Sequence, residues 1–171
     1  MDQRRRQFEA QALPHLDAAY NLARWLSRSP SDAEDIVQDA MLRAFRGFDG
    51  FRGGDAKPWL LQIVRNCWRD HAGRARKHEP LGENAESLAS GEPDPEAQAS
   101  RRSEARSLES AIGAIPEEFR EVLILREIED MSYREIAAAT GAPIGTVMSR
   151  LARARALLRE RWLAQNEGST G

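Results

Sequence analysis

The chain has 171 residues and a formal net charge of -2, with 41% hydrophobic but only 6% aromatic residues, which fits one domain or, as we expect, two small helical domains with modest cores. Its single cysteine, Cys67, excludes an internal disulfide, and no metal-site spacing surrounds it, so we expect neither a metal nor a cofactor. No stretch approaches about 18 consecutive apolar residues, and the start lacks an apolar signal-peptide core, so we expect a cytoplasmic protein without membrane insertion.

The small net charge conceals two basic segments. Residues 62–78 and 144–161 each carry five Lys or Arg side chains against one acidic side chain. The stretch at 79–110, which lies between them, is acidic. Because local potential rather than net charge attracts phosphate, the two basic segments are candidate nucleic-acid contacts.

Apolar residues at helical spacing predict two helices in the first part of the chain. The first spans 16–26, and Pro14 begins or kinks it. The second is expected to begin at Ser31, because Ser31 and Glu34 have the spacing of a capping box. The polar residues of its outward face are Glu34, Asp35, Gln38, Asp39, Arg43 and Arg46. Taken alone, such a face is usually just solvated surface.

A glycine-rich loop and a basic helix follow. Four glycines in residues 47–57 predict the loop, and its Phe51 either stacks on an unpaired base or packs on its own domain. Pro58 is expected to begin a helix on which Asn66 and Arg69 lie among other polar and basic side chains. A stacking surface beside basic groups suits single-stranded nucleic acid. The alternative is a surface helix that happens to be basic.

Residues 79–104 have no apolar periodicity and are rich in Pro, Gly, Ser and acidic groups, so we expect a flexible acidic linker. Its charge would repel duplex DNA but would let it follow a basic groove in a protein partner. Two further helices are expected after it, one around 108–115 and one beginning at Pro116. With the two helices described next, they complete a four-helix C-terminal domain.

Residues 131–162 predict two helices joined by a sharp turn. Ser132 and Glu135 have capping-box spacing and mark the start of the first helix. Met131 and Ile136 lie where a hydrophobic staple would fix the entry of the chain. Gly141 suits the left-handed conformation that commonly ends a helix.

The second of these helices, opened by Pro143, has an apolar side and a polar side. The apolar stripe consists of Val147, Leu151, Ala154 and Leu158. The polar side consists of Thr146, Ser149, Arg150 and Arg153. This arrangement is typical of a helix-turn-helix, whose second helix enters the DNA major groove. The alternative is an ordinary helical hairpin with a solvated basic face, but the capping box, staple and glycine turn are each separate requirements of the motif.

The chain resembles the extracytoplasmic-function class of bacterial RNA polymerase sigma factors in three strings: DAEDIVQDAMLRAFR at 32–46, FRG and then WLLQIVRNCWRDH up to His71, and IPEEFREVLILREIEDMSYREIAAATGAPIGTVMSRLARARALLRER at 115–161. The resemblance implies an all-α fold of two small helical domains joined by the acidic linker. It assigns 1–78 to sigma region 2, which binds polymerase and recognises and melts the minus-ten element. It assigns 105–165 to sigma region 4, which recognises the minus-thirty-five element. The implied partners are core RNA polymerase, promoter DNA and an anti-sigma factor.

The same resemblance assigns roles to residues singled out above. Polymerase binding falls on Asp35, Gln38, Asp39 and Arg43. Minus-ten recognition falls on Phe51, Asn66 and Arg69. Minus-thirty-five contacts fall on Thr146, Ser149, Arg150 and Arg153. No residue is assigned to catalysis or to a metal.

The chain departs from the common family pattern at three positions. Thr140 stands where a larger apolar residue usually precedes the turn glycine, which predicts looser packing between the last two helices. Met148 replaces a commonly basic residue of the recognition helix, and Ala152 replaces a commonly polar one. We therefore expect an unchanged docking mode, while these positions leave the choice of promoter open.

The sequence argues against two other classes of function. An autonomous helix-turn-helix regulator would bind duplex DNA without polymerase and usually as a dimer, but the second basic helix, the aromatic loop and the lack of a dimerisation stripe argue against it. An enzyme has little support, because His15, His71 and His78 are scattered and no nucleophile–base spacing occurs.

Overall fold

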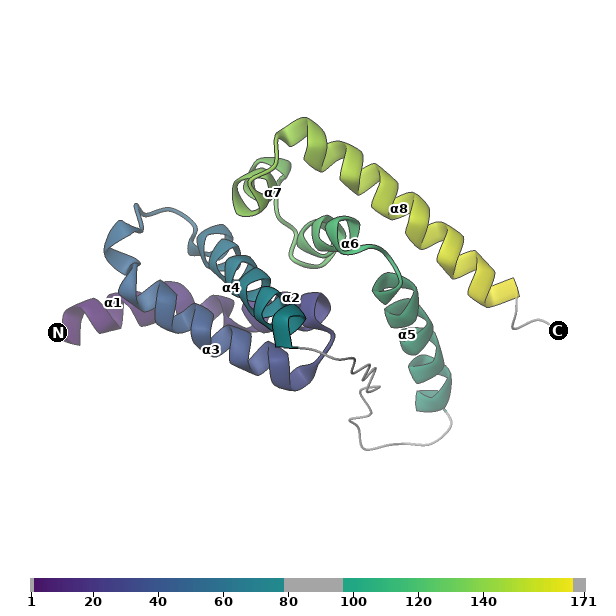
Figure 1. Cartoon of the computed structure of the whole chain (residues 1–171), viewed down its shortest axis with the longest axis horizontal. Coiled ribbons are helices and arrows are strands. Elements are labelled where there is room, and N and C mark those ends of the chain that lie inside the picture. Colours follow the sequence, from purple (N-terminus) through teal and green to yellow (C-terminus); the bar gives the residue numbers. More distant parts are fainter. Residues whose placement is uncertain (1, 79–96, 168–171) are drawn as a thin grey trace.

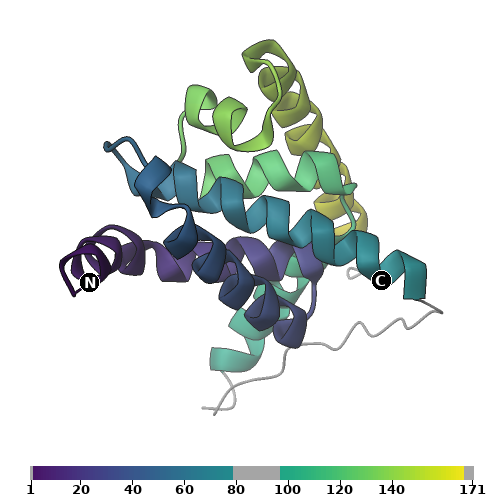
Figure 2. The ribbon, with the colours of Figure 1, turned by 60° about the vertical axis from the view of Figure 1, so that its left-hand side comes forward.

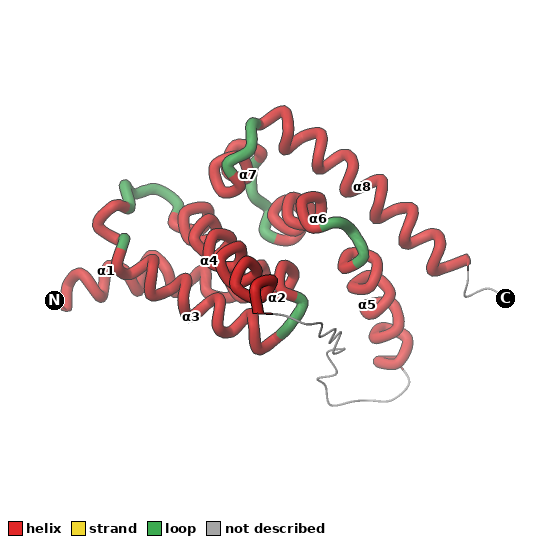
Figure 3. Tube along the Cα trace, viewed as in Figure 1, coloured by secondary structure: helices red, strands yellow, loops and turns green. Residues whose placement is uncertain are grey.

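The computed structural model describes residues 2–78 and 97–167, and within these two stretches every regular element is a helix (Figure 3). The prediction of an all-α fold is confirmed. Figure 1 shows the chain as two groups of helices, α1 to α4 and α5 to α8.

Three mutually packed helices form the core of the N-terminal half: α2, α3 and α4. The elements are α1 (Asp2–Ala12), η1 (Leu13–His15), α2 (Leu16–Ser27), α3 (Pro30–Arg46), η2 (Phe48–Gly50) and α4 (Ala56–His78). Their largest fully buried side chains include Leu22, Ile36, Leu60 and Leu61. Helix α1 was not expected, because its sequence is almost entirely polar; only Phe8 and Ala12 are buried in the core.

The start of α3 differs from the prediction. The helix begins at Pro30, and its N-cap is Ser29, whose hydroxyl accepts a hydrogen bond from the Asp32 backbone N–H at 3.3 Å. Ser31 lies inside the first turn, so its assignment as the cap was wrong. A proline at the first helical position has its φ already set for a helix and loses no needed N–H, which favours the serine before it as the cap.

The start of α4 also precedes the predicted one. The helix begins at Ala56 rather than at Pro58. The Asp55 carboxylate accepts a hydrogen bond from the Lys57 backbone N–H at 3.0 Å. An aspartate in this position satisfies a donor that the first turn leaves unpaired, so the proline falls within the first turn instead of opening it.

The C-terminal half contains four α-helices, as predicted. The elements are α5 (Ala97–Gly113), α6 (Glu117–Leu123), the π-helical turn η3 (Ile124–Ile128), α7 (Tyr133–Thr140) and α8 (Ile144–Glu167). Residues 97–104, expected to belong to the linker, are helical and form the first part of α5. Ala, Gln, Arg and Glu favour helix without an apolar stripe, which is why periodicity missed this extension. The rest of the expected linker, 79–96, lies outside the described residues.

The two halves pack against each other through α2 with α6 and α4 with α7. Figure 2 shows α6 running alongside α4. Buried apolar side chains from both halves belong to one continuous cluster, to which Leu61 and Val64 of α4 and Val122 and Leu125 of the α6–η3 segment contribute.

Two ion pairs cross this interface from α4. Lys57 Nζ donates to the Glu129 backbone carbonyl at 2.6 Å and lies 3.3 Å from the Glu129 carboxylate. Arg65 Nε donates to the Glu121 carboxylate. Both glutamates are only 5% exposed. Burial raises the pKa of Glu121, while the adjacent Arg65 guanidinium acts in the opposite direction. The basic side of α4 is therefore partly neutralised by the C-terminal half.

Candidate nucleic-acid interface

The start of α7 has the predicted capping box. The Ser132 backbone N–H donates to Glu135 Oε1 at 2.8 Å, and the Glu135 backbone N–H donates to Ser132 Oγ at 3.0 Å. Met131 and Ile136, the expected staple, are both buried. The capping box satisfies backbone N–H groups of the first turn, and the staple residues shield that turn. The predicted beginning of this helix is therefore confirmed.

The turn after α7 is built on Gly141, which has φ 74° and donates its N–H to the Ala137 carbonyl at 2.9 Å. A side chain in this left-handed region is strained, so glycine is the favoured residue. The preceding Thr140 is 8% exposed, and its hydroxyl donates to the Ile136 carbonyl at 2.8 Å. Thr140, which stands where the family usually has a larger apolar residue, therefore leaves no unsatisfied hydroxyl between α7 and α8.

Helix α8 packs through the predicted apolar stripe. Val147, Leu151 and Ala154 are buried, and Leu158 is half-buried. Since successive residues advance by about 100° around a helix, the side opposite this stripe is centred near Ser149. The orientation of α8 relative to solvent therefore follows from four residues of the sequence.

The predicted polar set on α8 divides into two pairs. Ser149 and Arg153 are exposed, whereas Thr146 and Arg150 are half-buried at the edge of the packed side. Ser149 Oγ also donates to the Thr146 carbonyl at 3.1 Å. The exposed side of the first turns includes three residues outside that set: Ile144, Met148 and Ala152. Arg153 is thus the predicted arginine best presented to a duplex.

Another arginine of the basic segment is held by the C-terminal half itself. Both Arg155 Nε and Nη2 donate to Glu127 Oε1, at 2.9 and 2.6 Å, and so join α8 to the π-helical turn. Hydrogen bonding to Glu127 raises the pKa of Arg155. Sequence spacing could not separate this structural arginine from those available to DNA, because Glu127 lies far away in the chain.

The outward face of α3 presents Asp35 and Gln38 to solvent. Asp39 and Arg43 are less exposed and are tied together, because Arg43 Nη2 donates to Asp39 Oδ2 at 3.2 Å. Arg43 Nη1 also donates to Asp70 Oδ2 at 2.8 Å, which links α3 to α4. The hydrogen bond to Asp70 raises the pKa of Arg43. Two of the four predicted polymerase contacts therefore also have a structural partner.

Phe51 lies in an aromatic cluster of its own domain. Its ring centroid is 4.9 Å from that of Trp59 and 5.9 Å from that of Phe48, which in turn meets Phe8 edge to face at 5.5 Å. Phe51 remains partly exposed. In the structure Phe51 is therefore packed on its own domain and is not free to stack on a base.

Asn66 and Arg69 are exposed on α4. Trp59, on which Phe51 packs, precedes Asn66 by seven residues, or about 10 Å along the helix axis. The structure therefore places Asn66 and Arg69 together near the middle of α4, whereas Phe51 lies near the N-terminal end of this helix.

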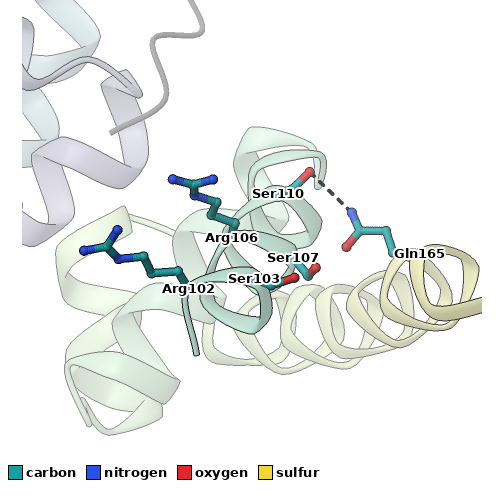
Figure 4. Close-up of a pocket in the computed structure, with 6 residues that line it drawn as sticks. All are labelled: Arg102, Ser103, Arg106, Ser107, Ser110 and Gln165. Carbon is teal, nitrogen blue, oxygen red and sulfur yellow. Dashed lines mark hydrogen bonds between the residues drawn. The ribbon is translucent and has the colours of Figure 1, made fainter. Parts of the chain in front are cut away.

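A hollow between α5 and α8 lies apart from these surfaces (Figure 4). Its lining residues are Arg102, Ser103, Arg106, Ser107, Ser110 and Gln165. Gln165 Nε2 donates to Ser110 Oγ at 3.3 Å. The lining has serine hydroxyls but no histidine or carboxylate that could act as a base beside them.

No group of three or more His, Cys, Asp and Glu side chains within 2–78 and 97–167 is placed to hold a metal ion. None of the helices in these ranges has the length and hydropathy needed to cross a membrane.

Comparison with known proteins identifies the two halves. A family model for sigma-70 region 2 matches residues 13–78, and one for sigma-70 region 4 matches residues 105–158. The chain therefore belongs to the sigma-70 family of RNA polymerase sigma factors, within its extracytoplasmic-function (ECF) class.

Individual relatives agree with this assignment. ECF RNA polymerase sigma factor SigE of Mycolicibacterium smegmatis is 36% identical over 91% of this chain, which spans 61% of that relative. ECF RNA polymerase sigma factor EcfG of Rhodopseudomonas palustris is 37% identical, covering 78% of this chain and 72% of the relative. Among solved structures, the sigma factor RpoE of Bartonella quintana, crystallised with the anti-sigma factor NepR, matches with a TM-score of 0.69 and 29% identity over 91% of this chain and 96% of its own.

Proposed function

We propose that this protein binds core RNA polymerase and directs promoter-specific initiation of transcription, as a non-enzymatic factor acting in the cytoplasm. The carrying observation is the helix-turn-helix of α7 and α8, whose exposed side presents Ser149 and Arg153. A second basic helix, α4, lies in the other half of the same chain. Two separate DNA-facing helices match a promoter with two separated elements better than a single operator site.

Each half has its own role. Residues 1–78 bind polymerase and recognise the minus-ten element through Asn66 and Arg69, with Phe51 released from its aromatic cluster to stack on an unpaired base. Residues 105–165 recognise the minus-thirty-five element through α8, with Arg153 central and Arg150 at the edge. The stretch between them, 79–104, connects the two.

The polymerase-binding surface is the outward face of α3. Asp35 and Gln38 are exposed there, and Leu42, one turn beyond Gln38, is 55% exposed. The acidic groups of this face repel DNA phosphates, whereas a protein partner can cover the apolar side chain beside them. Asp39 and Arg43 complete this surface beside them.

An anti-sigma factor is a further partner. The structurally similar RpoE was crystallised with such a protein, and we include this class of partner in the proposed function. A protein that covers either α3 or α8 would compete with polymerase or promoter DNA.

Reconstitution with purified bacterial core polymerase tests the proposal. The full chain should co-elute with core on size exclusion and should then produce discrete transcripts from a fragmented bacterial genome, whereas core alone should not. Specific binding to duplex DNA by the chain without core, together with failure to associate with core, would instead identify an autonomous regulator.

A further inference from the structure

Two large apolar side chains lie exposed at the beginning of the recognition helix α8. Ile144 is 43% exposed and Met148 is 51% exposed, whereas Val147 and Leu151 on the packed side are 0% and 1% exposed. Residues four apart are neighbours on a helix surface. Ile144, Met148 and the exposed Ala152 therefore form one continuous strip, which we call the apolar strip.

The apolar strip runs directly beside the polar groups assigned to DNA. Ser149 and Arg153 each follow a strip residue by one position and are exposed with it. In a helix-turn-helix the N-terminal part of the second helix approaches the base edges in the major groove. The strip occupies that part of α8, so its side chains enter the groove together with Ser149.

The apolar feature of a base edge in the major groove is the C5-methyl group of thymine. Guanine presents two acceptors there, which an arginine can satisfy but a methionine cannot. An unbranched thioether side chain can also adjust to the position of a methyl group at little conformational cost.

We propose that Met148, with Ile144 beside it, contacts thymine methyl groups of the minus-thirty-five element and makes this chain select thymine where a basic side chain would select guanine. This inference rests on the proposed function and deepens it by naming residues that determine promoter choice. A protein surface is the competing occupant of the strip. DNA is favoured because Arg153, exposed next to Ala152 of the strip, supplies positive charge that a duplex attracts.

The test uses holoenzyme assembled from the full chain and core polymerase. It is first offered a pool of duplexes with a randomised minus-thirty-five region and a mismatched minus-ten region, so that duplex opening does not limit binding. In the enriched duplex each thymine is then replaced singly by deoxyuridine, which keeps the base pairing and removes only the methyl group.

We expect thymine enrichment at one or more positions, and about fourfold weaker binding when the contacted thymine becomes deoxyuridine, as follows from exposing one methyl group. Met148→Ala should bind both duplexes equally, and Met148→Arg should move the preference at that position to guanine. Leu163→Ala is the matched control, because Leu163 is 52% exposed on α8 but about four turns from Met148. It should retain the thymine preference.

The inference would be overturned if the enriched duplexes had no thymine, or if deoxyuridine still weakened the binding of Met148→Ala. Either result would leave the sigma-factor function intact. A Met148→Ala variant that associates more weakly with core but whose holoenzyme keeps the thymine preference would also overturn the inference, since the strip would then belong to a protein interface. Failure of the parent chain to associate with core would count against the proposed function, and with it against the inference.

Discussion

The thiol of Cys67 shows how strongly packing controls the chemistry of one residue. The side chain is 1% exposed, and burial raises its pKa from the ordinary 9.0 to about 11. The reactive thiolate is therefore scarce in the folded protein at neutral pH. We expect iodoacetamide to label the native chain far more slowly than the denatured chain, with equal labelling as evidence against this burial.

The same shift gives a pH dependence of stability. The folded state holds the Cys67 proton more tightly than the unfolded state, so this contribution is complete below pH 9 and is lost as the pH rises to about 11. Other groups of the chain also lose protons at high pH, so the parent is compared with Cys67→Ala. The melting temperature should fall more steeply in the parent over this range.

Asp35 is the cleanest probe of the proposed polymerase-binding face, because Asp39 is already paired with Arg43. Exposed charges away from caps usually change the free energy of unfolding by less than about 0.5 kcal/mol. Asp35→Lys should therefore keep the melting temperature and abolish co-elution with core. Asp17→Lys, an exposed charge reversal on α2, is the control and should retain it. A lower melting temperature with intact core binding would make Asp35 a structural residue.

At the scale of elements, α8 carries two exposed arginines, two positions apart in sequence, with different surroundings. Arg153 points outward, whereas Arg155 is paired with Glu127. Arg153→Ala should weaken minus-thirty-five binding by about 1–3 kcal/mol if it contacts a base, with a changed preference at one position. A uniform loss over all sequences would assign it to phosphate. Arg155→Ala should leave the preference unchanged, as measured by competition between duplexes, and the reverse pattern would exchange their roles.

Most elements could be predicted from sequence because their signals are local. The capping box at Ser132, the turn at Gly141 and the stripe beginning at Val147 depend on residues within one or two turns. The prediction failed where two nearby serines could each cap the same helix, as at Ser29 and Ser31. It also failed where a helix lacks an apolar face, as in α1 and in residues 97–104.

The residues grouped in the candidate site could be chosen from the sequence, but which of them are exposed could not. Spacing grouped Arg150 with Arg153, yet one is half-buried and the other exposed. Neither the ion pair between Glu127 and Arg155 nor the packing of Phe51 on Trp59 follows from periodicity, because the partners lie on different elements. Tertiary contacts decide which members of a predicted set stay exposed.

At the scale of the whole molecule, contact between the halves affects the surfaces used for function. Helix α4 carries Asn66 and Arg69, two of the expected minus-ten residues, on its exposed side. Through Lys57 and Arg65 it also forms ion pairs with Glu129 and Glu121 of the other half. Arg28 Nη1 adds a hydrogen bond to the Gly113 carbonyl at 2.8 Å. Promoter elements lie at separate places along a duplex, so the arrangement of the halves bears directly on how both are reached.

The pair between Arg65 and Glu121 gives a direct test of what holds the halves together. Removing one member of a buried pair leaves the other charge desolvated and costs about 3–5 kcal/mol. In Arg65→Ala the Glu121 carboxylate, 5% exposed, regains water most simply if the halves separate. We therefore expect a larger radius of gyration by small-angle X-ray scattering, with the helical content unchanged by circular dichroism. Arg155→Ala, which breaks a pair inside one half, should leave the radius unchanged. An unchanged radius with a lower melting temperature in Arg65→Ala would show that the halves form one rigid unit, held mainly by the apolar contacts between α4 and α7.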